Sequence, residues 1–143
     1  MNSIEEYDFL KTKILKYVLF KKRTEREVRQ KFSENAGILL EDVIEYLKQE
    51  KYIDDENYII RSVNEFINLK NLSLKELKYK LLTKGINKDL IEDYIANNKD
   101  NLLEYELKSA TRILIKKENL LPKEEIINYL RKKGYLEETI KNI

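Results

Sequence analysis

The chain has 143 residues, of which 38% are charged and 42% hydrophobic, and its formal net charge is +2. It contains neither cysteine nor histidine, which excludes a thiol nucleophile, a Cys/His zinc site, a Ser-His-Asp triad and disulfide bonds. One proline and three glycines are too few for the turns of a β-sandwich or barrel, so the composition favours helices. No stretch approaches the roughly 20 apolar residues of a membrane span, and nothing at the N-terminus resembles a signal peptide.

The first third of the chain predicts three helices. Residues 4–20 carry apolar side chains at helical spacing, and the basic run at residues 21–23 suits the negative end of that helix. Thr24 opens a capping box with the glutamate three residues later, which predicts a second helix over residues 24–32. A loop follows, and residues 41–50 predict the third helix.

The middle of the chain predicts the same order. Asp54 is a suitable cap for a helix over residues 55–69. Ser73 opens the next helix with a second capping box, and Gly85 is its expected left-handed stop. Asn87 is then expected to cap a further helix.

The last third is expected to begin after a polar break at residues 97–100. Helices are predicted over residues 101–117 and 122–133, the second with Pro122 in its first turn, and a short final helix contains Ile140. The inner face expected for the helix over residues 101–117 consists of Leu103, Leu107, Ala110, Ile113 and Leu114.

The three parts share one spacing, which indicates an internal repeat. Thr24, Ser73 and Pro122 are 49 residues apart, and so are the glycine stops Gly85 and Gly134. Units of this size gain stability by stacking on their neighbours. The sequence therefore predicts an all-α fold of nine helices in three tandem three-helix repeats that form one continuous structural unit. The repeats are expected at residues 1–53, 54–99 and 100–143.

Charge is balanced within each repeat, with 11 basic and 10 acidic residues, then 8 and 8, then 9 and 8. Any contact with a nucleic acid must therefore come from local clusters of basic residues. One interpretation of these clusters is a basic surface for phosphates or an acidic partner, and the alternative is a solvated helix face in a lysine-rich protein. The candidate residues are Lys21, Lys22, Arg23, Arg26, Arg29, Lys31, Lys75, Lys78, Lys80, Arg131, Lys132 and Lys133.

Other polar and aromatic residues favour structural roles. Asp54 and Asp55 suit helix capping better than a metal site, because no further ligands accompany them. A P-loop is absent, and no carboxylate pair stands in an apolar context, so we expect no catalytic residue, no cofactor and no metal. Stacking on nucleic-acid bases is weighed against core packing for several tyrosines, and core packing is favoured. These tyrosines are Tyr7, Tyr17, Tyr46, Tyr94 and Tyr129.

Three motifs occur in order along the chain. Residues 15–32 read LKYVLFKKRTEREVRQKF, a helix end followed by basic residues and a capped helix. Residues 51–55 read KYIDD, and the helix from Glu76 ends in the sequence KGI; residues 129–140 read YLRKKGYLEETI. In these motifs nearly the whole chain resembles the RecX family, bacterial regulators of the RecA recombinase. Lys51 stands where the family usually has glycine, and Ile59 where a small residue is usual.

The resemblance implies an elongated, curved array of helical repeats that binds RecA and the RecA–single-stranded DNA filament. It implies a cytoplasmic, non-catalytic regulator that inhibits filament growth, ATP hydrolysis and strand exchange in DNA repair, recombination and the SOS response. The candidate basic residues would then contact RecA or DNA, and weak direct DNA contact stays open. A monomer is the default expectation.

Two alternatives stay open at this point: a helical DNA-binding module that acts without RecA, and a generic helical scaffold for another protein. The net charge of only +2 counts against the first of these. Neither alternative involves a membrane or a cofactor.

Overall fold

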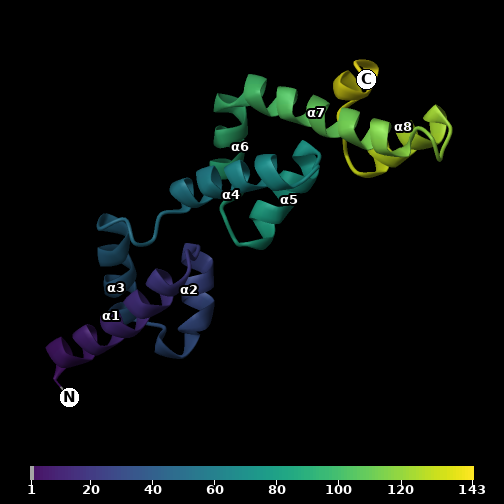
Figure 1. Ribbon diagram of the computed structural model, residues 1–143. Coiled ribbons are helices and arrows are strands. Elements are labelled where there is room, and N and C mark those ends of the chain that lie inside the picture. Colours follow the sequence, from purple (N-terminus) through teal and green to yellow (C-terminus); the bar gives the residue numbers. More distant parts are fainter. Residues whose placement is uncertain (1) are drawn as a thin grey trace. The chain divides into compact units, whose positions relative to one another are not determined.

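The computed structural model describes residues 2–143, and every regular element in that range is a helix (Figure 1). The prediction of an all-α fold is confirmed, and the helices follow the predicted order. None of the described helices is both long enough and apolar enough to cross a membrane. The helices of residues 2–143 are α1 (Ser3–Phe20), α2 (Glu25–Lys31), α3 (Ile38–Gln49), α4 (Asp55–Leu69), α5 (Leu74–Thr83), α6 (Lys88–Asn97), α7 (Lys99–Lys117), α8 (Lys123–Lys132) and α9 (Glu137–Lys141), with a 3-10 turn η1 (Ser33–Asn35) before α3.

Three predicted boundaries are wrong. Helix α3 begins at Ile38, three residues earlier than expected, because Gly37 adopts a φ of 141° and starts the helix directly after the turn. The polar break at residues 97–100 is reduced to Asn98, which alone separates α6 from α7. Pro122 stands immediately before α8 with extended backbone instead of inside its first turn.

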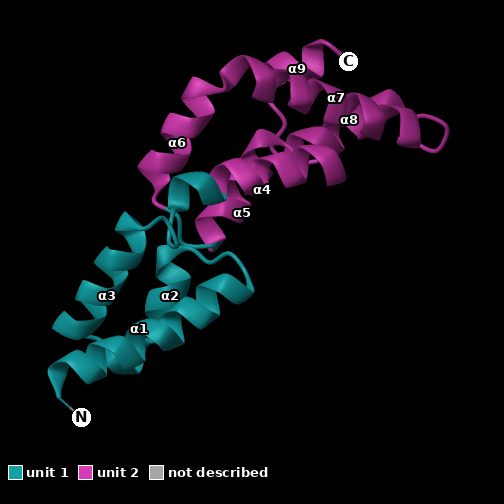
Figure 2. Ribbon diagram, turned by 60° about the vertical axis from the view of Figure 1, so that its left-hand side comes forward, with its two compact units in different colours: residues 1–58, 84–86 teal, residues 59–83, 87–143 magenta. Residues whose placement is uncertain are grey.

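The chain divides into two compact units (Figure 2). Unit 1 runs to Tyr58 and includes Lys84–Ile86, and unit 2 consists of Ile59–Thr83 and Asn87–Ile143. The repeat boundaries at residues 53/54 and 99/100, and the elongation and curvature of the array, stay predictions.

The core of unit 1 lies between α1, α2 and α3. The stripe predicted for α1 is confirmed, since Leu10, Ile14 and Val18 are buried and α1 packs against α3. Burying one such aliphatic side chain contributes about 1.5–3 kcal/mol. The other buried members of this core are Val28, Phe32, Leu40, Val43, Ile44, Leu47 and Ile53.

A core cluster of unit 2 joins α7, α8 and α9. It contains Ala110 from α7, Ile126 and Leu130 from α8, and Tyr135 and Ile140 at the C-terminal end. The inner face predicted for α7 is confirmed in part. Ala110 is buried in this core, Ile113 and Leu114 are half-buried and pack against it, and Leu103 and Leu107 are half-buried. The fully buried residues of α7 are Leu102, Tyr105, Glu106, Ser109 and Ala110, a stripe in which polar groups alternate with apolar ones.

Lys51 is the single non-glycine residue with a positive φ, 64°, in the part of the chain that the structure describes. It ends α3 in a left-handed turn that lets Tyr52 and Ile53 donate their N–H groups to the carbonyl of Leu47. A side chain with a Cβ is strained by about 1 kcal/mol in this conformation.

We therefore predict that Lys51→Gly raises the free energy of unfolding by about 0.5–1 kcal/mol, or Tm by about 3 °C, although glycine also loses backbone entropy on folding. Thermal unfolding followed by circular dichroism measures this. Lys51→Ala is the control, because it removes the same charge but keeps the Cβ. An equal gain in the alanine variant would rule out the backbone explanation.

Two buried tyrosines of unit 2 hold their hydroxyl groups in hydrogen bonds. Tyr105 donates to the carbonyl of Lys70 at 2.7 Å and accepts the N–H of Leu72 at 2.9 Å. The hydroxyls of Tyr135 and Ser109 lie 2.6 Å apart. Burial raises the pKa of both tyrosines above the ordinary value, although their hydrogen bonds oppose the shift.

This shift predicts a loss of stability in alkali. Each tyrosine ionises near pH 10 when unfolded but stays neutral when folded, so its contribution is complete below pH 10 and falls as the pH rises toward the raised native pKa. The fall is at most about 1.4 kcal/mol per pH unit for each tyrosine. Urea unfolding at several values above pH 9 measures it. Tyr135→Phe should flatten the slope, while Tyr52→Phe, at an exposed position, should leave it unchanged.

Candidate functional site

Two capping hydroxyls join segments that are 60 residues apart in the sequence. Both predicted capping boxes are confirmed: the Thr24 hydroxyl accepts the N–H of Glu27 at 3.2 Å, and the Ser73 hydroxyl accepts that of Glu76 at 3.0 Å. In unit 1 the Thr24 hydroxyl also donates to the carbonyl of Lys84 at 2.6 Å. In unit 2 the Ser73 hydroxyl donates to the carbonyl of Lys133 at the same distance. Each hydroxyl therefore starts one helix and holds the end of another.

A basic side chain covers the glycine at each of these junctions. Gly85 and Gly134 have φ values of 85° and 91°, as predicted for left-handed stops. A Cβ on Gly134 would lie 2.7 Å from Cδ of Lys75, and one on Gly85 would lie 2.1 Å from Cδ of Arg26. Glycine is therefore required both by φ and by the close approach of these side chains.

In unit 2 the junction creates a pocket of about 450 Å³. Within the described residues, none of its lysines takes part in an ion pair, and its single carboxylate, Glu76, accepts the N–H of Ser73 at 3.1 Å. Tyr79 is 67% exposed. We call this the basic pocket, and its lining residues are Lys75, Glu76, Tyr79, Lys80 and Thr83 from α5, with Lys132 and Lys133 at the end of α8.

The basic pocket thus brings together Lys75, Lys80, Lys132 and Lys133, four of the twelve candidate residues. Two further candidates of unit 2 are held by carboxylates. Lys78 lies 2.9 Å from Glu92, and its hydrogen bond lowers the pKa of that carboxyl.

Arg131 is the other paired candidate of unit 2. It lies 2.7 Å from Glu137, whose pKa it lowers through their hydrogen bond. Like Lys78, it already has an acidic partner.

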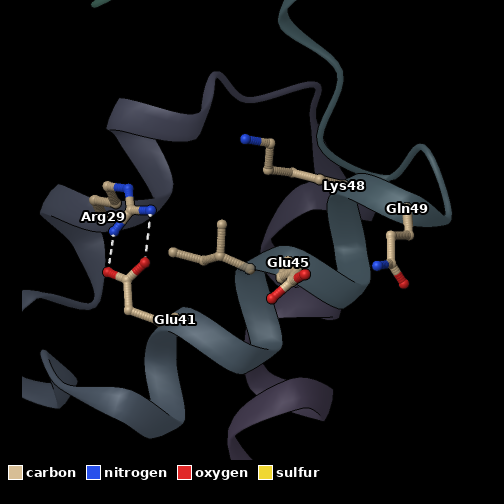
Figure 3. A pocket seen from close by; sticks show the side chains of 6 residues that line it. Arg29, Glu41, Glu45, Lys48 and Gln49 are labelled. Atoms are coloured by element: carbon tan, nitrogen blue, oxygen red, sulfur yellow. Dashed lines mark hydrogen bonds and ion pairs between the residues drawn. The ribbon is translucent and has the colours of Figure 1, made fainter.

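Unit 1 contains a pocket of about 410 Å³ whose charges cancel (Figure 3). Arg29 donates two hydrogen bonds to Glu41, which raise its pKa, and a third to Glu25 at 3.1 Å. Lys48 lies 2.8 Å from Glu25. Burial alone would raise the pKa of Glu25, but its hydrogen bonds with Lys48 and Arg29 outweigh that effect and lower it. Arg29 is therefore fully engaged within unit 1.

The remaining candidates of unit 1 lie around Tyr17. The guanidinium carbon of Arg23 is 4.2 Å from the centroid of this ring, and the ammonium of Lys31 is 5.9 Å from it. Lys21 is exposed and Lys22 half-buried, while the stem of Arg26 covers Gly85. The role of all these residues in binding stays a prediction.

The expected packing of the tyrosines is confirmed for some of them. Tyr7 and Tyr17 pack against the core of unit 1, and Tyr129 packs against that of unit 2. Tyr94 is half-buried. Tyr46 is 37% exposed, so the core role expected for it is wrong.

The capping role predicted for the two aspartates is confirmed, with an unexpected partner for one. Asp54 accepts the N–H of Asn57 at 3.1 Å and so caps α4. Asp55 accepts the N–H of Glu25 at 3.0 Å and so caps α2, which lies 30 residues earlier. Burial raises the pKa of Asp55, although the hydrogen bond from Glu25 opposes the shift.

Glu106 is a structural residue that the sequence analysis missed. It is completely buried on α7 and accepts the N–H of Leu74 at 2.8 Å. It also accepts the N–H of Leu136 at 2.9 Å and the hydroxyl of Thr139 at 2.6 Å. One carboxylate therefore binds the N-terminal ends of both α5 and α9. Helical spacing places Glu106 on the same face as Leu102 and Ala110, but its charge assigns it to the surface, and the donors that it meets come from other segments.

No protein-family model matches the chain. Curated relatives do: a regulatory protein RecX from Staphylococcus epidermidis is 32% identical over 98% of this chain and 55% of the relative. One from Finegoldia magna is 33% identical over 90% of this chain and 67% of the relative. The chain spans about half the length of several of these relatives.

Solved structures agree with this result. The crystal structure of RecX from Lactobacillus salivarius matches with a TM-score of 0.81 at 21% identity, and the match covers 97% of this chain and 94% of that structure's chain. A crystal structure of another regulatory protein RecX matches with a TM-score of 0.83 at 20% identity, and the match covers 99% of this chain and 74% of that structure's chain. The chain thus has the all-helical fold of these solved structures. The curated relatives add the family to the fold: the chain belongs to the RecX family.

Proposed function

We propose that this chain is a non-catalytic cytoplasmic regulator that binds RecA and the RecA–single-stranded DNA filament as a monomer and inhibits ATP hydrolysis and strand exchange. The observation that carries the proposal is the 33% identity to a regulatory protein RecX over 90% of this chain and 67% of the relative. The fold that the chain shares with solved RecX structures over nearly its whole length supports it.

The physical basis of binding would be multivalent. A filament presents the same surface many times, and a chain of helical repeats offers several weak contacts whose effects multiply when they share one backbone. The basic pocket supports this interpretation, because its four lysines have no acidic partner among the described residues and suit DNA phosphates or an acidic protomer surface. Affinity for the filament should then fall as salt rises.

The test is the single-stranded DNA-dependent ATPase of the cognate RecA, preassembled on DNA and titrated with this protein. We expect loss of hydrolysis at well below one molecule per RecA, as filament capping or groove binding would give. DNA binding by this protein alone is the control, and a complex without RecA that is as tight as the complex with the filament would favour an independent DNA-binding module. Unchanged hydrolysis at equimolar protein that is folded and helical would contradict the proposal.

A further inference from the structure

We propose that the basic pocket of unit 2 binds a short segment of single-stranded nucleic acid, with its lysines on successive phosphates and a base stacked on Tyr79. The proposal concerns free nucleic acid and does not rest on the regulation of RecA. It follows from the placement, the charge and the aromatic group of the pocket.

The pocket is built by local structure. Lys75, Tyr79 and Thr83 are spaced by four residues, so they lie along one face of α5 and its last turn. The hydrogen bond from Ser73 to the carbonyl of Lys133 fixes the end of α8 beside the start of α5. Cations from two helices therefore face the same hollow.

Two lysines of the pocket, Lys75 and Lys133, are held in place without being neutralised. The stem of Lys75 lies over Gly134, and the ammonium of Lys133 is 5.6 Å from the centroid of the Tyr129 ring. The nearby Lys78 and Arg131 are the cations that have carboxylate partners. With four lysines and one glutamate, the pocket has an uncompensated positive charge. Lysine presents a compact ammonium that suits single phosphate oxygens, whereas bidentate carboxylate recognition favours arginine.

Tyr79 makes a nucleic acid a better ligand than an acidic protein. This residue is 67% exposed among these lysines and belongs to no described core cluster. An exposed aromatic ring in a positively charged groove is the arrangement on which unpaired bases stack. Bases inside a duplex are not accessible to such a ring, so the ligand is single-stranded. The volume of about 450 Å³ lies in the range of small-ligand sites and suits one or two nucleotides.

The repeat offers an internal comparison. Gln30 lies 49 residues before Tyr79, and Glu34 lies 49 residues before Thr83. The matching position on α2 therefore has no aromatic ring, and the matching position in η1 carries an added negative charge. The tyrosine beside the lysines is a property of the basic pocket and does not follow from the repeated spacing.

The test is fluorescence anisotropy of a labelled oligothymidylate of about 20 nucleotides, without RecA, at about 50 mM salt. Tyr79→Gln introduces the residue found at Gln30. It should raise Kd about fivefold or more, because one base–tyrosine stack is lost. Tyr52→Gln, at another exposed tyrosine, should leave Kd within about twofold. Circular dichroism confirms that each variant is folded.

The salt dependence of oligothymidylate binding tests whether the lysines contact phosphates. The double variant Lys80→Gln/Lys132→Gln should reduce the slope of log K against log salt by about 0.7 for each phosphate that the protein no longer neutralises. Lys116→Gln/Lys123→Gln removes two exposed charges of unit 2 outside the pocket and should change the slope much less.

Four results would overturn the proposal. These are no binding of the oligothymidylate at about 100 µM protein, an unchanged Kd for Tyr79→Gln, equally tight binding of a duplex, and equally effective competition by polyglutamate. The last result would assign the pocket to an acidic protein surface. Because RecA is absent, none of these outcomes depends on the inhibition assay.

Discussion

Replacing Glu106 with alanine is expected to lower the free energy of unfolding by about 4 kcal/mol and Tm by about 10 °C or more. The carboxylate is completely buried and accepts three hydrogen bonds, two from backbone N–H groups and one from the hydroxyl of Thr139. Alanine leaves all three donors buried without a partner and creates a cavity. Urea and thermal unfolding followed by circular dichroism measure the loss.

Glu104 provides the matched control on the same helix. Its carboxylate is exposed and forms an i,i+4 pair with Lys108 at 3.1 Å, so Glu104→Ala should stay within about 0.5 kcal/mol of the wild type. Glu106→Gln tests the charge itself, since its amide keeps one acceptor oxygen but turns an NH₂ toward a donor. We expect a loss smaller than that of alanine. If Glu106→Ala unfolds like Glu104→Ala, the carboxylate does not hold the two helix ends together.

Glu106 also shows why the core of unit 2 was harder to predict than that of unit 1. The apolar stripe of α1 could be taken from the sequence because Leu10, Ile14 and Val18 are all hydrophobic. The buried stripe of α7 contains Glu106 and Ser109, which hydrophobicity assigns to the surface. Their burial depends on donors that other helices supply, and no spacing within α7 reveals those donors.

Caps and stops were predictable because they are local. The capping boxes of Thr24 and Ser73 close within four residues, and the left-handed φ of Gly85 and Gly134 follows from the helix ends. The second hydrogen bond of each capping hydroxyl spans 60 residues. It depends on how distant segments pack, so it could not be derived from either segment alone.

The sequence identifies the basic residues, but it does not show which of them pair with carboxylates. Nothing in the sequence distinguishes Arg131 and Lys78, which meet carboxylates, from Lys80 and Lys132, which do not. Their partners lie on the following helices, and the geometry of the turns decides which pairs form. The place of Tyr79 among these lysines depends on the end of α8, which the sequence does not position.

Charge reversal in the basic pocket, Lys80→Glu/Lys132→Glu, is expected to raise the concentration needed for half-inhibition of the RecA ATPase by about tenfold or more. Each glutamate replaces attraction to a phosphate or acidic surface by repulsion. Among the described residues neither lysine side chain takes part in an ion pair or hydrogen bond, so the substitutions should not unfold unit 2. Lys116→Glu/Lys123→Glu changes the net charge equally, from +2 to about −2, outside the pocket. It should therefore inhibit nearly as well as the wild type at moderate salt.

Tyr79→Gln in the same assay identifies what the pocket meets in the filament. If the pocket lies on DNA, a base stacks on Tyr79. Tyr79→Gln should then weaken inhibition, as the charge reversal does. An acidic RecA surface needs only the lysines, and Tyr79→Gln would then inhibit normally while Lys80→Glu/Lys132→Glu fails. Equal inhibition by the wild type and the charge-reversed protein would remove the basic pocket from the filament contact. Filament binding would then have to come from the basic residues of unit 1, beginning with Lys21 and Lys22.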